Sequence, residues 1–490
     1  MVATPPSPAW RHTMIRSLVL CAAIATICAG CAAGPDYKRP SLPAPSGYVR
    51  GEQPAVIGTD TAQAQRFSPA PVQGEWWTMF GSAALDARVK QALAHNASLD
   101  AALAALDAAR ENVAAQRATY FPSAQLSYAP SRQRDAVGTL SPTLSNNATY
   151  YSLHTARLDV SYAPDVFGLN RRTVESLSAQ AEGQRYQLDA ARLTIATNVV
   201  NAAITEASLR AQIDATNEVI ADGERALTIL RDQARLGYAS AMDVAAQESA
   251  LAQSRQALPG LRKQLAQNRD LLAVLCGEAP ADGGSPEFVM DGLTLPATLP
   301  EVVPAKLVDQ RPDVKAAETD VQAASAAVGI ALASRLPQLN LTASYGSSAT
   351  TFSRMFTDDN VFWSLAGSVT QSVFDFGALK HKQRSAEAEL RQSVAQYRGV
   401  VLGAFQDVAD TLYALEEDAH AYAAANDAEV AAQRTMKLTA EQQRLGYVGT
   451  LAAITARQAW QQARIAKIQA QATRLQDSAA LVQALGGNWM

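Results

Sequence analysis

Two periodicities of apolar and polar residues recur along this chain. Leu99, Leu103 and Leu106 lie three and four positions apart, which is the spacing of a helix with one apolar face. Residues 124–128 and 339–345 instead alternate apolar with small or polar side chains, as a strand with one apolar face does. The chain is therefore predicted to combine helices with a small number of strands.

The helical pattern runs furthest over residues 169–235 and 378–444, both free of proline. At 1.5 Å per residue, each run predicts a helix of roughly 100 Å, longer than an ordinary globular domain requires. Each run ends at an Arg-Leu-Gly-Tyr motif, where glycine permits the left-handed backbone of a turn. The pattern then returns over residues 242–275 and 451–484, which predicts two antiparallel helical hairpins of coiled-coil character.

The same motifs occur twice at a constant spacing. Three pairs lie 209 residues apart: Phe167-Gly168 with Phe376-Gly377, Leu236-Gly237-Tyr238 with Leu445-Gly446-Tyr447, and Cys276-Gly277 with Leu485-Gly486. Upstream, Phe121-Pro122 and Leu336-Pro337 correspond at a spacing of 215. The constant spacing indicates helices that stay in register, so the chain is predicted to contain an internal repeat. The longer spacing upstream means that the segment between these motifs is longer in the first copy, as is typical of a loop.

Each half is predicted to hold one strand hairpin, with strands over about 123–131, 151–163, 338–347 and 360–373. Strands of roughly ten residues cross a membrane when tilted, and a sheet in hydrocarbon must close so that every edge is paired. Closure needs about eight strands or more, so four strands imply an oligomer. Two copies would give a filled lumen and three would give an open pore; a small soluble sheet that caps a coiled coil is the alternative. Aromatic residues near the strand ends suit interfacial girdles: Tyr128, Tyr150, Tyr151, Tyr162, Tyr345, Phe352, Phe362 and Trp363.

The N-terminus has the pattern of a secretory signal. An apolar run over residues 18–29 follows Arg11 and Arg16, and it is too short to span a membrane. The run ends in Cys28-Ala29-Gly30-Cys31, and its last three residues resemble a bacterial lipobox, although Cys28 stands where leucine is usual. This resemblance implies a signal peptide over residues 1–30 and a lipid on Cys31.

The segments beside the signal carry two further predictions. The long, proline-containing stretch before the apolar run raises the hypothesis that translation starts at Met14 rather than Met1. Residues 31–75 are rich in Pro, Gly, Ser and Ala without apolar periodicity, which predicts an extended tether. Trp76 and Trp77 follow it, and we expect them to pack against the body rather than to stack on a ligand.

Composition and motifs exclude several classes of function. The 490 residues are 48% hydrophobic, yet no apolar run of the ~20 residues that a spanning helix needs occurs beyond the N-terminus, which excludes a polytopic helical membrane protein. Lys and Arg number 42 against 46 Asp and Glu, with no basic block, so nucleic acid is not expected as a partner. The five histidines are scattered without metal-ligand spacing. Asp375-Phe376-Gly377 copies a kinase motif, but its repeat mate is Val166-Phe167-Gly168, so we expect a strand-to-helix corner and neither an enzyme nor a cofactor.

Taken together, the motifs of this sequence resemble those of the TolC/OprM-type outer-membrane efflux proteins, specifically the NodT-like lipoprotein branch that serves RND pumps. The matching residues are Gly34-Pro35-Asp36-Tyr37, Arg39-Pro40, Trp76-Trp77, Phe80, Arg311-Pro312-Asp313-Val314, Ala317-Glu318, Gly329, Leu336-Pro337, Phe374-Asp375-Phe376-Gly377, Leu445-Gly446-Tyr447 and Ala484-Leu485-Gly486-Gly487-Asn488-Trp489. The resemblance implies a mainly helical fold with membrane strands, in which a homotrimer forms a twelve-stranded outer-membrane barrel and a helical periplasmic tunnel. The first repeat is expected over residues 76–278, a linker over 279–303 and the second repeat over 304–490.

The resemblance also implies a site, partners and a function. The hairpin tips, Leu236-Gly237-Tyr238 and Leu445-Gly446-Tyr447, would contact a periplasmic adaptor (membrane fusion) protein that leads to an inner-membrane RND pump. The family's gate positions, a leucine and an aspartate, correspond to Leu451 and Thr455 here, so the second position lacks the family's carboxylate. Asp243 is a candidate to supply that carboxylate; the alternative is that it only caps the returning helix. The expected function is a passive gated duct, anchored in outer-membrane lipid, that exports drugs or other small toxic solutes. The alternatives are the duct of a type I protein-secretion system and a lipid-anchored periplasmic scaffold without a pore.

Overall fold

The computed structural model describes residues 32–41, 47–51, 54–58, 64–68, 74–134, 150–282, 284, 286–300 and 309–487. These residues form two compact units, each built from segments of both sequence halves. The strand unit contains the described residues up to Pro40 together with Asp107–Gly183 and Glu318–Gln396. The hairpin unit contains the remainder, so the compact units do not coincide with the sequence repeats.

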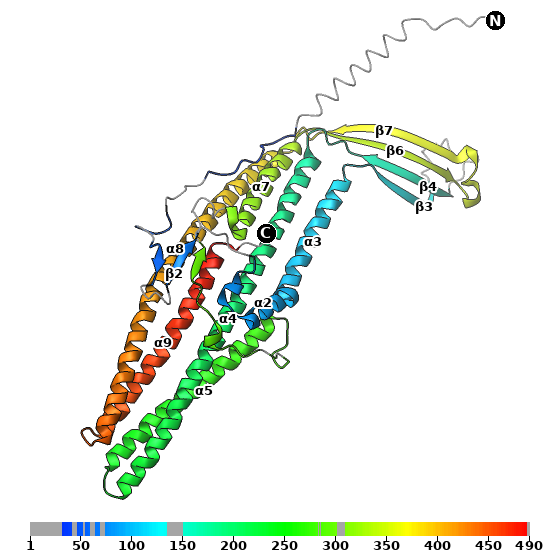
Figure 1. Ribbon diagram of the computed structural model, residues 1–490. Coiled ribbons are helices and arrows are strands. Elements are labelled where there is room, and N and C mark those ends of the chain that lie inside the picture. Colours follow the sequence, from blue (N-terminus) through cyan, green and yellow to red (C-terminus); the bar gives the residue numbers. More distant parts are fainter. Residues whose placement is uncertain are drawn as a thin grey trace, which may run out of the picture. The chain divides into compact units, whose positions relative to one another are not determined.

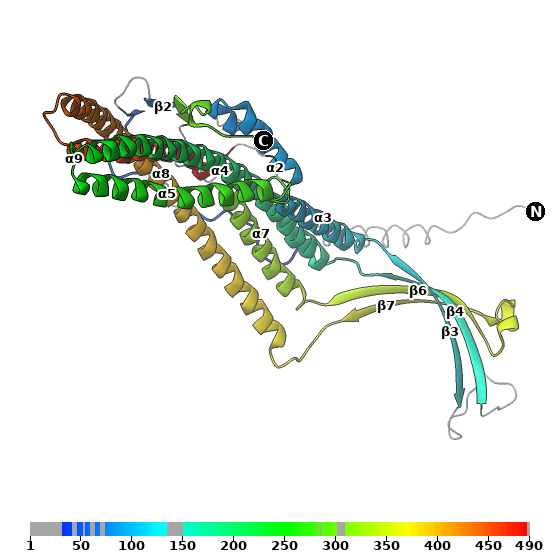
Figure 2. The same cartoon turned by 90° about the horizontal axis from the view of Figure 1, so that it is seen from below.

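The strand unit is organised around one four-stranded antiparallel sheet (Figures 1 and 2). Its strands are β3 (Ser123–Arg134), β4 (Tyr150–Tyr162), β6 (Gln338–Ala349) and β7 (Val361–Thr370), in the order β3-β4-β6-β7. The pairing of β4 with β6 joins the hairpin of the first half to that of the second. All four strands overlap the ranges expected from alternation; β3 runs three residues further, and β7 ends three residues sooner because its last expected residues lie outside the ladder.

The register of the sheet separates an apolar face from a polar face. Because side chains alternate along a strand, partners in the ladder share a face. The apolar face contains Leu126, Tyr128, Leu158, Val160, Leu341, Tyr345, Trp363, Leu365 and Val369. The polar face contains Gln125, Ser127, Arg157, Asp159, Asn340, Thr342, Ser344 and Ser364. Tyr151 and Phe362 alternate onto the polar face, so their assignment to a lipid-facing girdle is wrong.

The N-terminal segment of the strand unit is extended but packed. The Ala33 amide donates to Phe167 O at 3.0 Å, and an added Cβ on Gly34 would lie 2.4 Å from Gly329 Cα. Arg172 binds the Asp36 carboxylate at 2.9 Å, and it also donates to the carbonyls of Ala33 and Gly34. The extended segment expected over residues 31–75 is thus held against the strand unit at residues 33–36, through Phe167 and Arg172.

The hairpin unit contains the long helices. α4 (Leu169–Arg235) and α8 (Ala378–Arg444) have 67 residues each, and both begin in the strand unit. α5 (Ala241–Leu275) and α9 (Thr450–Ala484) have 35 residues each and return beside them as two hairpins (Figure 1). The equal lengths confirm the expected repeat of long helical hairpins. Among the described residues, no helix is both long and apolar enough to cross a membrane.

Short elements complete the two units. The helices are η1 (Trp76–Phe80), α2 (Ala83–His95), α3 (Ala97–Ala118), η2 (Met290–Gly292), α7 (Pro312–Ala333), η3 (Phe352–Arg354) and η4 (Asp358–Asn360). β1 (Val56–Ile57), β2 (Gln65–Ser68) and β5 (Thr298–Pro300) form a small sheet in the order β1-β2-β5. This second sheet also takes strands from the stretch expected to be a tether.

The main hydrophobic core lies in the hairpin unit where η1 and α2 meet the long helices. Trp76 and Trp77 are both 2% exposed, and the Trp77 indole donates to Asp86 at 2.9 Å. They belong to one buried cluster with residues of α4, α5 and α9, including Ile204, Leu272 and Leu475. The expected packing of the two tryptophans against the body is confirmed.

Candidate functional site

Both long helices end in the same turn geometry. After α4, the Tyr238 amide donates to Gln233 O at 2.8 Å and the Gly237 amide to Ala234 O at 3.1 Å. This pair of bonds forms a Schellman motif, and it requires the positive φ of +82° that glycine adopts without strain. After α8, Tyr447 and Gly446 make the same two bonds, at 2.9 and 3.0 Å. The sequence motif therefore terminates each hairpin by the same backbone chemistry.

The tip residues are exposed. Tyr238 and Tyr447 are 83% and 79% exposed, and Leu236 and Leu445 also face solvent. Both turns lie at the same end of the hairpin unit (Figure 1). Exposed apolar side chains grouped at a helix end are typical of a surface that a partner covers. Their contact with an adaptor stays a prediction.

Asp243 is bound into the start of α5. Its carboxylate accepts from the Ser240 amide at 3.1 Å and from the Ser240 hydroxyl at 2.7 Å, while the Asp243 amide donates to Ser240 Oγ at 3.1 Å. These hydrogen bonds form a capping box and lower the pKa of Asp243, the side-chain bond contributing most. The geometry accounts for Asp243 as a helix cap, and its role in a gate stays a prediction.

Leu451 and Thr455 lie one turn apart near the start of α9. Leu451 is 56% exposed, and the Thr455 hydroxyl donates to Leu451 O at 3.0 Å. The hydroxyl is thus bonded within its own helix, and this position supplies no carboxylate. The N-cap residue of α9 is Gly449, which provides no side-chain hydrogen bond, in contrast to Ser240 in the first half. Whether Leu451 and Thr455 narrow a pore stays a prediction.

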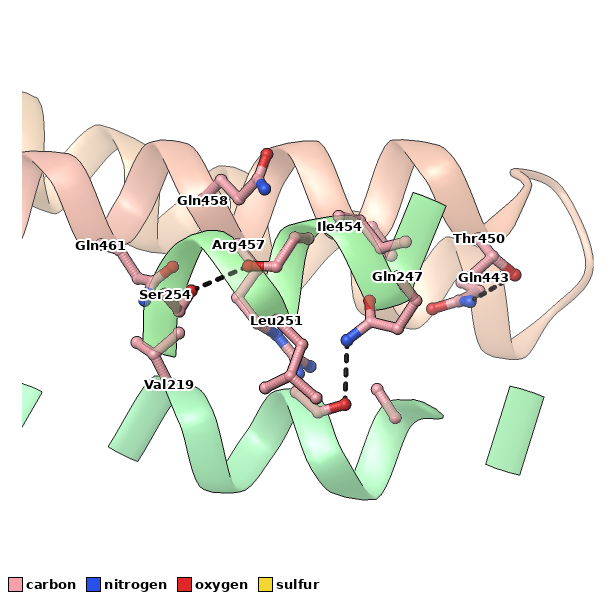
Figure 3. Close-up of a pocket in the computed structure, with 14 residues that line it drawn as sticks. Val219, Gln247, Leu251, Ser254, Gln443, Thr450, Ile454, Arg457, Gln458 and Gln461 are labelled. Carbon is pink, nitrogen blue, oxygen red and sulfur yellow. Dashed lines mark hydrogen bonds between the residues drawn. The ribbon is translucent and has the colours of Figure 1, made fainter. Parts of the chain in front are cut away.

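A cavity of about 70 Å³ lies between the two hairpins close to the turns (Figure 3). Residues from both halves line it, including Val219 of α4, Leu251 of α5 and Ile454 of α9. The Gln247 amide donates to Gly223 O at 2.9 Å, and the Gln443 amide donates to Thr450 Oγ1 at 3.3 Å. Each of these bonds stays within one hairpin.

Further from the turns, α4 and α9 are joined by a row of polar contacts, here named the polar seam. Its members are the hydrogen bonds Gln476 to Thr205 at 3.1 Å and Gln469 to Gln212 at 3.1 Å, and the ion pair Arg464 with Glu218. A polar contact exchanges readily with water, whereas an apolar one does not. At this level the two hairpins are joined by polar contacts, in addition to the buried cluster that α4, α5 and α9 share nearer the ends of α5 and α9.

Arg311 closes the second half at the other end of its helices. Its guanidinium donates to Ala484 O at 2.9 Å and pairs with Asp407 at 2.9 Å and Asp313 at 2.6 Å. An added Cβ on Gly486 would lie 2.8 Å from Arg311 Cα. The Arg-Pro-Asp-Val motif thus fastens the start of α7 to the middle of α8 and to the C-terminal end of α9. Its sequence pattern did not indicate this structural role.

The remaining candidates carry no reactive site. Cys31 and both candidate start residues lie outside the described residues, so lipidation and the translation start stay predictions. Asp375 accepts from the amides of Gly377 and Leu379 at 2.8 and 2.9 Å, as a helix-start residue does. Cys276 is 1% exposed, and burial raises the pKa of its thiol. Within the described ranges, no three His, Cys, Asp or Glu side chains are grouped to hold a metal ion.

The long hairpins and the two-faced sheet define a class, the outer-membrane channels with a TolC-like fold. The profile of the outer membrane efflux protein family matches residues 89–278 and 303–487, and the chain belongs to this family. It is 30% identical over 483 residues to the probable efflux pump outer membrane protein TtgC of Pseudomonas putida KT2440, covering 97% of this chain and 96% of that protein. It is 26% identical to outer membrane protein OprJ of Pseudomonas aeruginosa, with 95% of each chain covered.

Solved structures share the fold. The outer-membrane channel OprN aligns with a TM-score of 0.83 at 22% identity, over 94% of this chain and all of that chain. The open state of MtrE from Neisseria gonorrhoeae aligns with a TM-score of 0.80 at 24% identity, over 94% of this chain and 99% of that chain. The expected family, fold class and non-enzymatic function are confirmed: the chain is an outer-membrane efflux channel.

Proposed function

We propose that this channel is the outer-membrane component of a tripartite RND-type efflux system. It would be a passive gated duct that carries drugs or other small toxic solutes from the pump to the exterior. Relatives aligned over 97% of the chain are named an antibiotic efflux pump and a toluene efflux pump outer membrane protein in Pseudomonas putida. The observation that supports the duct most directly is the two-faced sheet of membrane-crossing length.

The working form would be a homotrimer. Within one chain, β3 and β7 are the outer strands of the sheet, and each has one unpaired edge. In hydrocarbon those edges must be paired, and β3 of one copy with β7 of the next would close twelve strands. The polar face, with Arg157 paired to Asp159 at 2.9 Å, would then line the lumen, and the apolar face would contact lipid.

The partners would bind at the helical end. The exposed turns around Gly237 and Gly446 would dock into a periplasmic adaptor (membrane fusion) protein, which would connect the duct to an inner-membrane RND pump. A lipid on Cys31 would add an anchor in the outer membrane. Leu451, Thr455 and Asp243 lie within a few residues of these turns, so adaptor docking would act directly on the gate candidates.

The polar seam and the cavity give this gate a physical basis. The cavity leaves room between the hairpins near the turns, and the seam holds them by contacts that water can replace. An adaptor that binds the open form of the hairpins somewhat more tightly than the closed form would shift the equilibrium between the two towards the open form. The chain itself supplies no energy source.

The test is single-channel conductance of the purified full-length protein in a planar bilayer, with its native mass in detergent. We expect a trimer with small conductance that rises in the variant Gly237→Val with Gly446→Val, because both positions require a positive φ. Gly399→Ala is the matched control, since a methyl group there meets open space. A species without conductance in every variant would contradict the duct and favour a scaffold, and passage of unfolded polypeptide would favour a protein-secretion duct.

A further inference from the structure

The apolar face of the sheet changes its chemistry along the strands. On β3 the residues of this face are Leu126, then Tyr128, then Pro130, and finally Arg132 and Arg134 at the end furthest from α3. Neighbours on one face of a strand lie about 7 Å apart, so the face passes from aliphatic to aromatic to cationic within about 27 Å. An acyl chain, an interface and a headgroup follow one another in the same order through a lipid leaflet.

Aromatic side chains mark the interface step. The rings of Tyr128 and Phe352 lie 6.1 Å apart at 87°, and those of Phe352 and Phe356 lie 5.9 Å apart at 83°. Tyr128 also shares a hydrogen bond of 2.8 Å with His154, which is stacked on it. Phe352 and Phe356 are 56% and 78% exposed, so this cluster forms an outward-facing aromatic belt.

The two arginines beyond the belt are available to a ligand. Both are exposed, and neither forms an ion pair with any residue in the described part of the chain. The Arg134 guanidinium lies 5.2 Å from the centre of the Tyr150 ring, which keeps it close to the sheet surface. The two arginines are neighbours on one face of the strand, with Cα atoms about 7 Å apart, and their guanidinium groups present forked donors that match phosphate oxygens.

We propose that Arg132 and Arg134 form a binding site for a phosphorylated lipid of the outer leaflet. The phosphate would be held by the arginines, the sugar or glycerol would lie on the aromatic belt, and the acyl chains would follow Leu126 and Leu158. A free phosphate ion would contact only the two arginines. The proposal rests on the proposed function, since it requires that the apolar face contact lipid in the closed barrel.

The probe is a bisphosphorylated, multiply acylated glucosamine disaccharide lipid added to the detergent-purified full-length channel, with bound lipid counted by native mass spectrometry. We expect Arg132→Gln with Arg134→Gln to weaken binding about tenfold or more, because two charge-assisted phosphate contacts are lost. Arg132→Lys with Arg134→Lys keeps both charges but loses the forked donors, so it should bind more weakly than the unmodified protein and more tightly than the double glutamine variant. Arg391→Gln, at an exposed site on α8, is the matched control and should bind as the unmodified protein does.

Two results would overturn the lipid site. One is equal binding of the same lipid without its phosphates, and the other is unchanged binding by the double glutamine variant. Inorganic phosphate that displaces the lipid at equal concentration would assign the site to a free anion instead. Conductance of the same preparations separates the two proposals. A conducting trimer that does not bind the lipid refutes only the lipid site. Absence of conductance refutes the duct.

Discussion

Among single residues, Asp477 is the carboxyl whose ionisation state depends most on its surroundings. It lies on α9 beside Asp418 of α8, with Arg474 one turn earlier and the same arginine reaching Gln65. Burial, followed by the hydrogen bond and the negative charge of Asp418, raises the pKa of Asp477 to about 8, and Arg474 only partly opposes this. At neutral pH Asp477 therefore keeps its proton, which lies beside the Asp418 carboxyl.

This proton makes stability depend on pH. The folded pKa of Asp477 lies above its ordinary value of 3.8, so the folded state binds a proton that the unfolded state has released. The contribution to stability is fully present below about pH 4 and is lost as the pH rises to about 8, above which it no longer changes. We expect the thermal unfolding midpoint to fall between pH 6 and pH 9, and Asp477→Asn to flatten that fall. An equal fall in Asp477→Asn and in the exposed control Asp410→Asn would contradict this assignment.

At the scale of elements, the two hairpins differ at the turns although their helices have the same lengths. α5 starts with a capping box between Ser240 and Asp243, and the corresponding positions of α9 are Gly449 and Ala452. Relative to glycine, an N-cap with a side-chain oxygen stabilises a helix start by roughly a few tenths of a kcal/mol, and Ala452 cannot supply the second bond of the capping box. The second hairpin is thus the one with the less stable turn.

Introducing a capping box at the start of α9 should make its first turn as stable as that of α5. In the variant Gly449→Ser with Ala452→Asp, we expect amide exchange in the first turn of α9 to slow severalfold, because a capping box satisfies two free donors. The first turn of α5 in the same sample serves as an internal reference and should not change. If exchange at α9 is already as slow as at α5 before the substitutions, the inferred difference between the hairpins is wrong.

The elements themselves could be predicted from the sequence because local chemistry determines them. Gly237 and Gly446 stop the long helices through positive φ, and strict alternation specifies the strands. The packing of the N-terminal segment could not be predicted, because it depends on the absence of a Cβ at Gly34 and Gly329, which lie far apart in sequence. The capping role of Asp243 was one of two alternatives, since a carboxylate three residues after a serine suits a cap and a gate equally.

At the scale of the whole molecule, the polar seam joins α4 of the first repeat to α9 of the second, so each of its contacts needs one side chain from each repeat. Its ion pair joins Glu218 of α4 to Arg464 of α9, and both side chains are partly exposed. Exposed ion pairs contribute about 0–1 kcal/mol, so one such pair biases an equilibrium without locking it.

Breaking this pair should favour the open channel. We expect Glu218→Gln to raise the closed-state conductance by a few-fold, since up to about 1 kcal/mol corresponds to roughly that factor. The exchanged pair Glu218→Arg with Arg464→Glu should restore the low conductance, because the attraction is preserved. Loss of closure in the exchanged pair as well would show that the individual side chains matter rather than their pairing.

The packed N-terminal segment has a practical consequence for handling the protein. Cys31 directly precedes Ala32, and Ala33 is bonded to Phe167 at the corner that leads from β4 to α4. An affinity tag fused in front of Ala32 would begin at this corner, whereas deletion of residues 32–40 would leave the Arg172 guanidinium without its three partners in that segment. Versions of the protein that are expressed without the signal should therefore start at Ala32 and not at the tryptophan pair.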